Sequence, residues 1–205
     1  MSPISAGTNP NFPSPCRRVV REAPTAFTVG MPIAIGAPFA AAVMVIADGR
    51  VATGAIFALV MMSIAVFDAW SCTIPDQLTL AAIALGCLYA VTVVPGETML
   101  TGLEAVLRGS AVAICFWIMR AAYRRFRGRE GLGFGDVKLA AVAGIWLDWS
   151  TVPLAIEIAT LTALTFHVAT VVLRRKAISP TAKLPFGLFF APAIWLAWVV
   201  QCVTE

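Results

Sequence analysis

Long apolar stretches separated by short polar segments dominate the pattern of hydrophobic and polar positions along the chain. A helix needs about 20 largely apolar residues to cross a bilayer, and somewhat fewer where the bilayer thins. On this basis the pattern predicts membrane-spanning helices near 28–47, 51–67, 77–95, 103–123, 137–149, 152–173 and 185–202. The fifth stretch is short. The predicted fold is therefore all-α, a polytopic membrane helix bundle with six to seven transmembrane helices.

Residues 1–26 differ from the rest of the chain, because they are polar, rich in Pro and Ser, and contain three arginines. A cleaved signal peptide is disfavoured here. The apolar stretch from Phe27 is long for its hydrophobic region, and no clear A-x-A site follows. We expect residues 1–26 to form a polar cytoplasmic extension and residues 27–205 to form one membrane-embedded domain.

Composition agrees with a membrane protein. The chain is 60% hydrophobic and 13% charged, whereas a soluble domain keeps about a quarter of its residues charged. The net charge of +4 comes from basic residues in short clusters between apolar stretches. Membrane topology and contact with lipid explain such clusters better than nucleic acid does, so we expect no nucleic-acid partner.

The distribution of Lys and Arg predicts the orientation. One set of loops carries Arg124, Arg125, Arg127, Arg129, Arg174, Arg175, Lys176 and Lys183, and the N-terminal arginines share that side if seven spans are counted. The opposite loops contain Asp48, Glu97, Glu104 and Asp148, with Arg50 and Arg108 as their basic residues. The positive-inside rule then places the N-terminus in the cytoplasm. Asp68 and Asp136 both fall at the cytoplasmic face of the membrane.

Asp68 ends one apolar stretch, and Ile74-Pro75-Asp76 opens the next. The residue before a proline is driven from helical geometry, so a tight turn should separate the two helices. Asp76 is suited to the start of the second helix. Asp68 is less easily explained. It would face the negative end of its helix dipole beside apolar residues, where an ionised carboxylate is costly.

A glycine-rich segment precedes the second aspartate. Gly131, Gly133 and Gly135 alternate with Leu132 and Phe134 before Asp136. Glycines leave the backbone free of Cβ atoms, which would let an extended substrate approach closely. The alternative is a flexible loop followed by a helix-capping aspartate. Lys138 either forms an ion pair with a carboxylate or extends its ammonium group to the membrane interface.

Two carboxyl groups brought together have a definite chemistry. One, ionised, takes a proton from water as that water attacks a peptide carbonyl, and the other, protonated, donates to the carbonyl oxygen. Two such acids cannot both ionise easily, so they share one proton. Which of the two holds it stays open. We expect no metal and no cofactor, since this chemistry requires neither.

Three ordered motifs carry a resemblance to a known family. They are Asp68 with Ile74-Pro75-Asp76-x-Leu78-Thr79-Leu80, then Gly133-Phe134-Gly135-Asp136-Val137-Lys138-Leu139, then Leu184-Pro185-Phe186-Gly187-Leu188-Phe189-Phe190. Together they resemble the type IV prepilin peptidases, which are G-x-G-D intramembrane aspartyl peptidases. The resemblance covers roughly residues 50–200, and Leu188 stands where that family usually has proline.

The resemblance implies that Asp68 and Asp136 are the catalytic pair, supported by Gly133, Gly135, Lys138, Pro75 and Asp76. It implies removal of basic leader peptides from type IV prepilins or pseudopilins at the cytoplasmic face of the inner membrane. Longer members carry a cytoplasmic domain with two C-x-x-C pairs, and this sequence has no C-x-x-C pair. The chain therefore resembles the short peptidases of tight-adherence (Flp) pili, with cleavage expected and methyl transfer not.

Two other classes of function are compatible with parts of the pattern. A small ion-coupled transporter or channel would use Asp68, Asp136 and Glu157 as a cation relay, but the predicted spans put two of these acids at one interface. A non-catalytic subunit of a pilus or secretion apparatus would not need both aspartates. The paired aspartates favour the peptidase.

Overall fold

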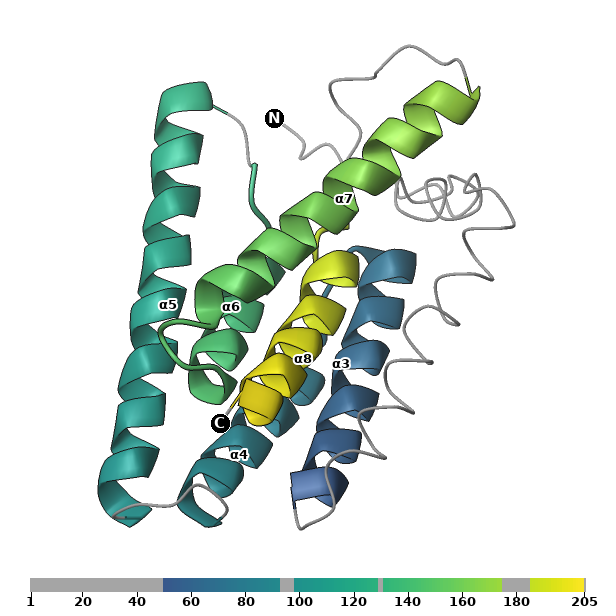
Figure 1. Cartoon of the computed structure of the whole chain (residues 1–205). Coiled ribbons are helices and arrows are strands. Elements are labelled where there is room, and N and C mark those ends of the chain that lie inside the picture. Colours follow the sequence, from purple (N-terminus) through teal and green to yellow (C-terminus); the bar gives the residue numbers. More distant parts are fainter. Residues whose placement is uncertain (1–49, 93–97, 129–130, 175–184, 205) are drawn as a thin grey trace, which may run out of the picture.

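The structure is a computed structural model that describes residues 50–92, 98–128, 131–174 and 185–204. That part of the chain contains six helices and no strand: α3 (Arg50–Ser71), α4 (Asp76–Thr92), α5 (Thr98–Arg127), α6 (Phe134–Trp146), α7 (Val152–Arg174) and α8 (Gly187–Thr204). Successive helices alternate in direction (Figure 1). As a result, the end of α3 and the starts of α4, α6 and α8 all lie at the same end of the bundle.

The all-α fold predicted from the hydropathy pattern is confirmed, and each predicted span after the first corresponds to one helix. The largest differences are at helix ends. The helix predicted over 51–67 continues to Ser71, which places Asp68 inside its last turn. The predicted span 28–47 lies outside the described residues. The division into an extension and a membrane domain stays a prediction.

Within the described residues, four helices are long and apolar enough to cross a membrane by themselves, namely α3, α5, α7 and α8. Helix α4 is apolar but has 17 residues. Helix α6 has 13 residues, which at about 1.5 Å per residue is shorter than a bilayer core of about 30 Å. It is nevertheless buried along most of its length and contacts α4, α5, α7 and α8. The protein is thus an integral membrane helix bundle with a short helix at its centre.

An aromatic cluster holds α6 in this central position. The Trp146 ring stacks on Phe57 with 3.7 Å between ring centroids and on Tyr89 at 5.3 Å, and it meets the edge of Trp198 at 5.9 Å. Its Nε1 donates a 2.9 Å hydrogen bond to the carbonyl oxygen of Ala82. Because these partners lie on α3, α4 and α8, one tryptophan joins four helices. Stacked and edge-on rings add to the stability gained from burial alone.

Candidate active site

Asp68 lies in the last turn of α3, and the residue is 6% exposed. The backbone N–H of Cys72 donates to the Asp68 carbonyl oxygen at 2.9 Å, and Cys72 has a left-handed φ of 49°. A left-handed residue just past the last turn is a common way for a helix to end. It turns the chain towards Pro75 and α4, as the sequence predicted for this segment.

The start of α8 supplies a partner for the Asp68 carboxylate. Asp68 Oδ2 accepts a 3.0 Å hydrogen bond from the backbone N–H of Leu188, the second residue of α8. The first N–H groups of a helix have no partner within that helix and lie at its positive end. A carboxylate placed unfavourably at the end of α3 is therefore compensated by the beginning of α8.

Gly187 makes this contact possible. A Cβ atom at this position would lie 2.7 Å from Asp68 Oδ2 and 3.1 Å from Ile74 Cδ1. Real Cβ atoms do not approach an oxygen so closely, so any larger residue would displace the carboxylate. The motif from Leu184 to Phe190 was recognised in the sequence by resemblance. That its backbone would hold Asp68 could not be predicted, because no local signal joins positions 120 residues apart.

Asp136 is the third residue of α6 and is 8% exposed. Its Oδ2 accepts a 3.0 Å hydrogen bond from the backbone N–H of Gly133, the residue before the helix begins. This is one half of a capping box, and glycine has no side chain with which to form the other half. Asp136 therefore does cap its own helix, as the alternative interpretation of the sequence expected. This capping hydrogen bond uses one of the two carboxylate oxygens, Oδ2.

The environment of Asp136 favours a bound proton. Burial raises the pKa of Asp136 to about 6, the Gly133 N–H acts against that rise, and the nearby charge of Asp68 adds to it. Burial disfavours the charged form, and a second negative charge disfavours it further. The two aspartates predicted to share one depth are therefore close enough to influence each other's ionisation.

Ile74 packs between the two aspartate sites. A Cβ atom on Gly135, next to Asp136, would lie 2.8 Å from Ile74 Cδ1, the same atom that limits Gly187. Ile74 is 5% exposed. Gly135 was interpreted from the sequence as room for a substrate backbone. In the structure it first makes room for this isoleucine, which joins α6 and α8 beside both carboxyl groups.

Lys138 pairs with Asp76. Its Nζ donates to Asp76 Oδ1 and lies 5.0 Å from the centroid of the Phe134 ring, while the Arg120 guanidinium is 5.5 Å from that ring. Residues two positions apart on a helix point in different directions. Lys138 therefore does not share a face with Asp136. The ion pair ties the start of α4 to the start of α6.

The remaining residues of the predicted motif lie nearby. Pro75 directly precedes α4, and its carbonyl oxygen accepts the Thr79 N–H at 3.3 Å. Asp76 is the first residue of that helix, as predicted.

Glu157 is exposed on α7, in contrast to the two buried aspartates. Among the described residues, no group of three or more His, Cys, Asp or Glu side chains could hold a metal ion.

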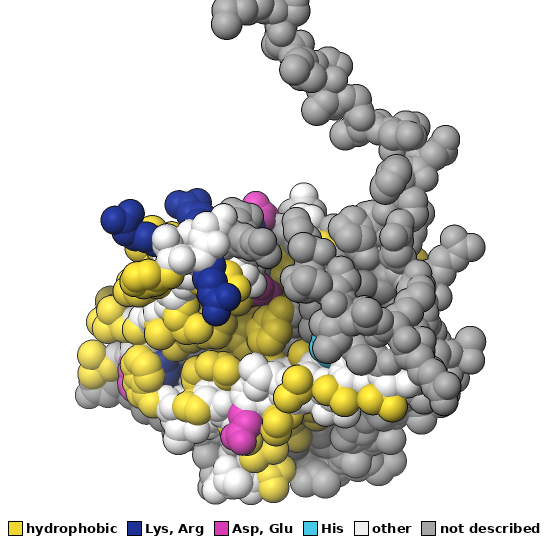
Figure 2. Space-filling model, turned by 90° about the horizontal axis from the view of Figure 1, so that it is seen from above, with side chains coloured by type: hydrophobic (Ala, Val, Ile, Leu, Met, Phe, Trp, Pro, Cys, Tyr) yellow, Lys and Arg dark blue, Asp and Glu magenta, His cyan; other side chains and the backbone are white. Residues whose placement is uncertain are grey.

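Basic side chains mark the end of the bundle that carries the carboxyl pair. Figure 2 looks down on this end and shows Lys and Arg side chains gathered on one side of it. The last turn of α5 contributes Arg124, Arg125 and Arg127, all exposed. These three arginines, which belong to the basic set identified in the sequence, therefore lie at the same end of the bundle as the carboxyl pair.

The fold and this geometry define an integral membrane helix bundle with two buried carboxyl groups, one on α3 and one on α6. The sequence model of the type IV leader peptidase family matches residues 55–168, more than half of the chain. The chain belongs to this family.

Curated relatives agree with this assignment. The chain is 31% identical over 138 residues to a prepilin leader peptidase/N-methyltransferase of Aeromonas salmonicida (strain A449), covering 67% of the chain and 45% of the relative. It is 36% identical over 135 residues to one of Dickeya chrysanthemi, covering 64% and 44%. For one of Escherichia coli (strain K12) the values are 29% over 157 residues, 73% and 66%. The chain spans about half the length of the first two. No solved structure matches the chain significantly.

Proposed function

We propose that this protein is a membrane aspartyl endopeptidase that removes the leader peptide of type IV prepilins or pseudopilins, Flp-type prepilins among them. Asp68 and Asp136 are the catalytic pair. The observation that carries the proposal is that α3 and α6 each bury one carboxyl group at the same end of the bundle, within electrostatic reach of each other. Membership of the type IV leader peptidase family supports the choice of substrate.

The chemistry follows from how the two carboxyl groups are held. Each accepts, at Oδ2, a hydrogen bond from a backbone N–H at a helix start, and because a carboxylate has about four acceptor positions, it can still exchange a proton with water or substrate. Ionised Asp68 takes a proton from a water molecule as the water oxygen attacks the peptide carbonyl. Protonated Asp136 donates to the carbonyl oxygen, and the tetrahedral intermediate then breaks its C–N bond with the proton passing to the leaving amine.

The supporting motif holds these groups in place. Gly133 provides the N–H for Asp136, and Gly135 admits Ile74. Pro75 sets the turn before α4, and the pair of Asp76 with Lys138 joins α4 to α6. Gly133 and Gly135 act next to the carboxyl groups, whereas the exposed pair of Asp76 with Lys138 contributes only weakly. Neither a metal nor a cofactor enters the proposal.

We place the site at the cytoplasmic face of the bacterial inner membrane. The arginines at the end of α5 lie on the same side of the bundle as the carboxyl pair, and positively charged segments remain in the cytoplasm. There they also meet anionic lipid headgroups. The apolar helix of a prepilin would stay in the bilayer while its leader reaches the acids. We assign residues 27–205 to the peptidase domain and residues 1–26 to a cytoplasmic extension.

The test is to co-express a prepilin with the wild-type chain, Asp68→Asn or Asp136→Asn, and to follow leader removal by gel mobility. Both variants should lose processing, because asparagine neither accepts a proton from water nor donates one. Glu157→Gln is the matched control, since it removes an exposed acid on α7. It should process normally. Undiminished processing by either aspartate variant would sink the aspartyl mechanism, and loss with Glu157→Gln would favour a relay through all three acids.

A further inference from the structure

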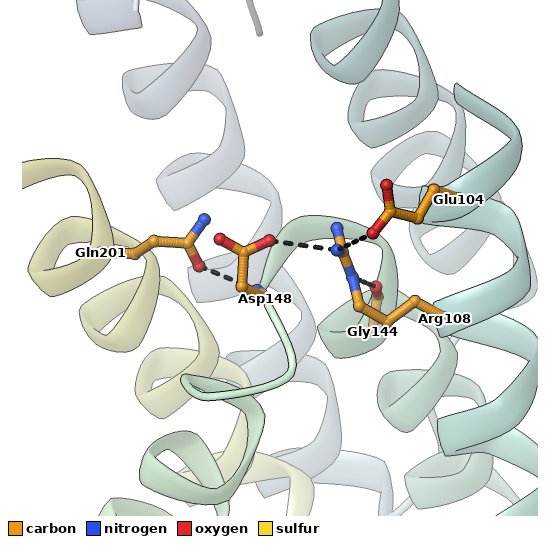
Figure 3. Close-up of polar contacts among 5 residues, drawn as sticks. All are labelled: Glu104, Arg108, Gly144, Asp148 and Gln201. Carbon is orange, nitrogen blue, oxygen red and sulfur yellow. Dashed lines mark hydrogen bonds and ion pairs between the residues drawn. The ribbon is translucent and has the colours of Figure 1, made fainter. Parts of the chain in front are cut away.

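Asp148, at the opposite end of the bundle from the carboxyl pair, joins three helices through different atoms. Its carboxylate Oδ1 lies 3.0 Å from Arg108 Nη1 on α5, and its backbone N–H donates to Gln201 Oε1 on α8 at 2.9 Å. Its carbonyl oxygen accepts the N–H of Val152 at the start of α7 at 3.0 Å. Figure 3 shows the two side-chain links converging on this one residue, in the turn just after α6.

Arg108 extends this network to α6. Its Nε donates a 2.9 Å hydrogen bond to the carbonyl oxygen of Gly144, while Nη1 pairs with Asp148. The backbones touch here, since a Cβ atom on Gly144 would lie 2.7 Å from Gly109 Cα and 2.8 Å from the Arg108 carbonyl oxygen. The Arg108 side chain is 12% exposed within a candidate membrane span. A charge so placed is stable only while it is paired.

The contacts at Asp148 tie α6 to α8. The start of α6 carries Asp136, and the start of α8 binds the Asp68 carboxylate through Leu188. Asp136 lies eight residues before Gly144 on α6, or roughly 12 Å along the axis. Leu188, which holds Asp68, lies 13 residues before Gln201 on α8, roughly 20 Å away. Because a helix moves as a rod, tilting α6 by about five degrees at Gly144 would shift Asp136 by about 1 Å.

We propose that Arg108, Asp148 and Gln201 form a remote brace that sets the distance between the Asp68 and Asp136 carboxyl groups by fixing α6 against α8. The brace residues touch no substrate and act as positioning residues. This inference rests on the proposed function for its kinetic consequence. Its structural consequence, a well-ordered start of α6 and of α8, stands independently of any activity.

The chain offers a matched pair of variants at one position and a control at another. Gln201→Met keeps the length of the side chain but removes the acceptor, whereas Gln201→Glu keeps an acceptor oxygen. The control Glu104→Gln removes an exposed carboxylate 3.7 Å from Arg108 on the same helix, so it cannot fix one helix against another. Arg108→Lys adds a further test, since lysine cannot reach both Gly144 and Asp148 with a rigid fork of donors.

Two measurements on the purified full chain in lipid vesicles test the brace. Prepilin cleavage should show a fall in kcat of up to about a hundredfold for Gln201→Met and Arg108→Lys with KM nearly constant, because a displacement of about 1 Å has effects of this order. Gln201→Glu and Glu104→Gln should stay within about twofold of the wild type. Amide hydrogen exchange should accelerate in Gln201→Met at 131–136 and 186–190, and not in the middle of α3.

The two readouts separate the brace from the proposed function. If the wild-type chain cleaves no prepilin, the peptidase proposal fails, while the exchange experiment still tests the brace. Wild-type kcat or wild-type exchange at both segments in Gln201→Met would overturn it. So would an equal loss of kcat in Glu104→Gln, which would show that charge near Arg108, and not the link to α8, is what matters.

Discussion

The Asp68 carboxylate and the Leu188 backbone N–H, 120 positions apart in the chain, are joined by a 3.0 Å hydrogen bond. One helix ends with an acid that its own dipole disfavours, and another begins with an N–H that its own helix cannot satisfy. The hydrogen bond gives the carboxylate a donor at the positive end of α8 and gives the Leu188 N–H an acceptor. Proline, usual at this position of the motif that the chain resembles, has no N–H, so the bond is a feature of this chain and not of the motif.

Replacing Leu188 with proline removes this donor from a position in the first helical turn, where proline is tolerated. We expect kcat/KM for prepilin cleavage to fall by about tenfold, because a hydrogen bond to a charged group contributes about 1.5–3 kcal/mol. Leu188→Ala keeps the N–H and should retain most of the activity. Equal losses in the two variants would assign the effect to side-chain packing.

Replacing Gly187 with alanine should displace the Asp68 carboxylate, since the new Cβ would lie 2.7 Å from Oδ2. We expect cleavage to fall by about a hundredfold, the order of effect of a displacement near 1 Å at a reacting group. Gly102→Ala is the control, because its Cβ would meet only a methyl group of Val91 at 2.9 Å. A Gly187→Ala enzyme as active as that control would contradict the assigned position of the carboxylate.

Cleavage should depend on pH through Asp136. Its pKa is raised to about 6, chiefly by burial, so it carries a proton below that pH and loses it above. With both carboxyl groups ionised the pair has no proton to donate. We expect kcat/KM to fall about tenfold for each pH unit above about 6. Cleavage at a constant rate from pH 6 to 8 would show that the proton lies elsewhere.

The same shift predicts how stability changes with pH. The folded chain binds a proton at Asp136 up to about pH 6, whereas the unfolded chain releases it near 3.8. Between these values the folded state holds more protons, so its stability is greatest below 3.8 and declines as pH rises through 6. Thermal unfolding midpoints should show this decline in wild type, and Asp136→Asn should lack this contribution. An identical decline in that variant would exclude Asp136 as its source.

The ion pair of Asp76 and Lys138 should contribute little to catalysis. Asp76 is 73% exposed, and exposed ion pairs contribute about 0.2–1 kcal/mol. We expect Asp76→Asn and Lys138→Gln each to slow cleavage by less than about threefold, with the exchanged pair Asp76→Lys/Lys138→Asp close to wild type. Complete inactivation by Asp76→Asn, with the protein still folded, would instead make Asp76 a third acid of the site.

Much of this protein is determined by its sequence alone. Apolar stretches long enough to cross a bilayer predicted the helices, since in lipid every backbone polar group must be satisfied within its own segment. The sequence predicts a role for Asp68 because an aspartate contradicts local preference at a helix end. It predicts a role for Asp136 because of the glycines before it and the resemblance that both segments carry. These signals are local, so a linear pattern contains them.

The partners of these residues were decided only by the tertiary structure. No periodicity indicates that Leu188 would hold Asp68, that Ile74 would fill the space above Gly135 and Gly187, or that Lys138 would choose Asp76. Nor does it indicate the convergence of Arg108 and Gln201 on Asp148. Such contacts depend on how closely helices pack. The distance between two packed helices depends on how their many side chains fit together. The sequence gives the size of each side chain but not how the side chains of different helices are arranged.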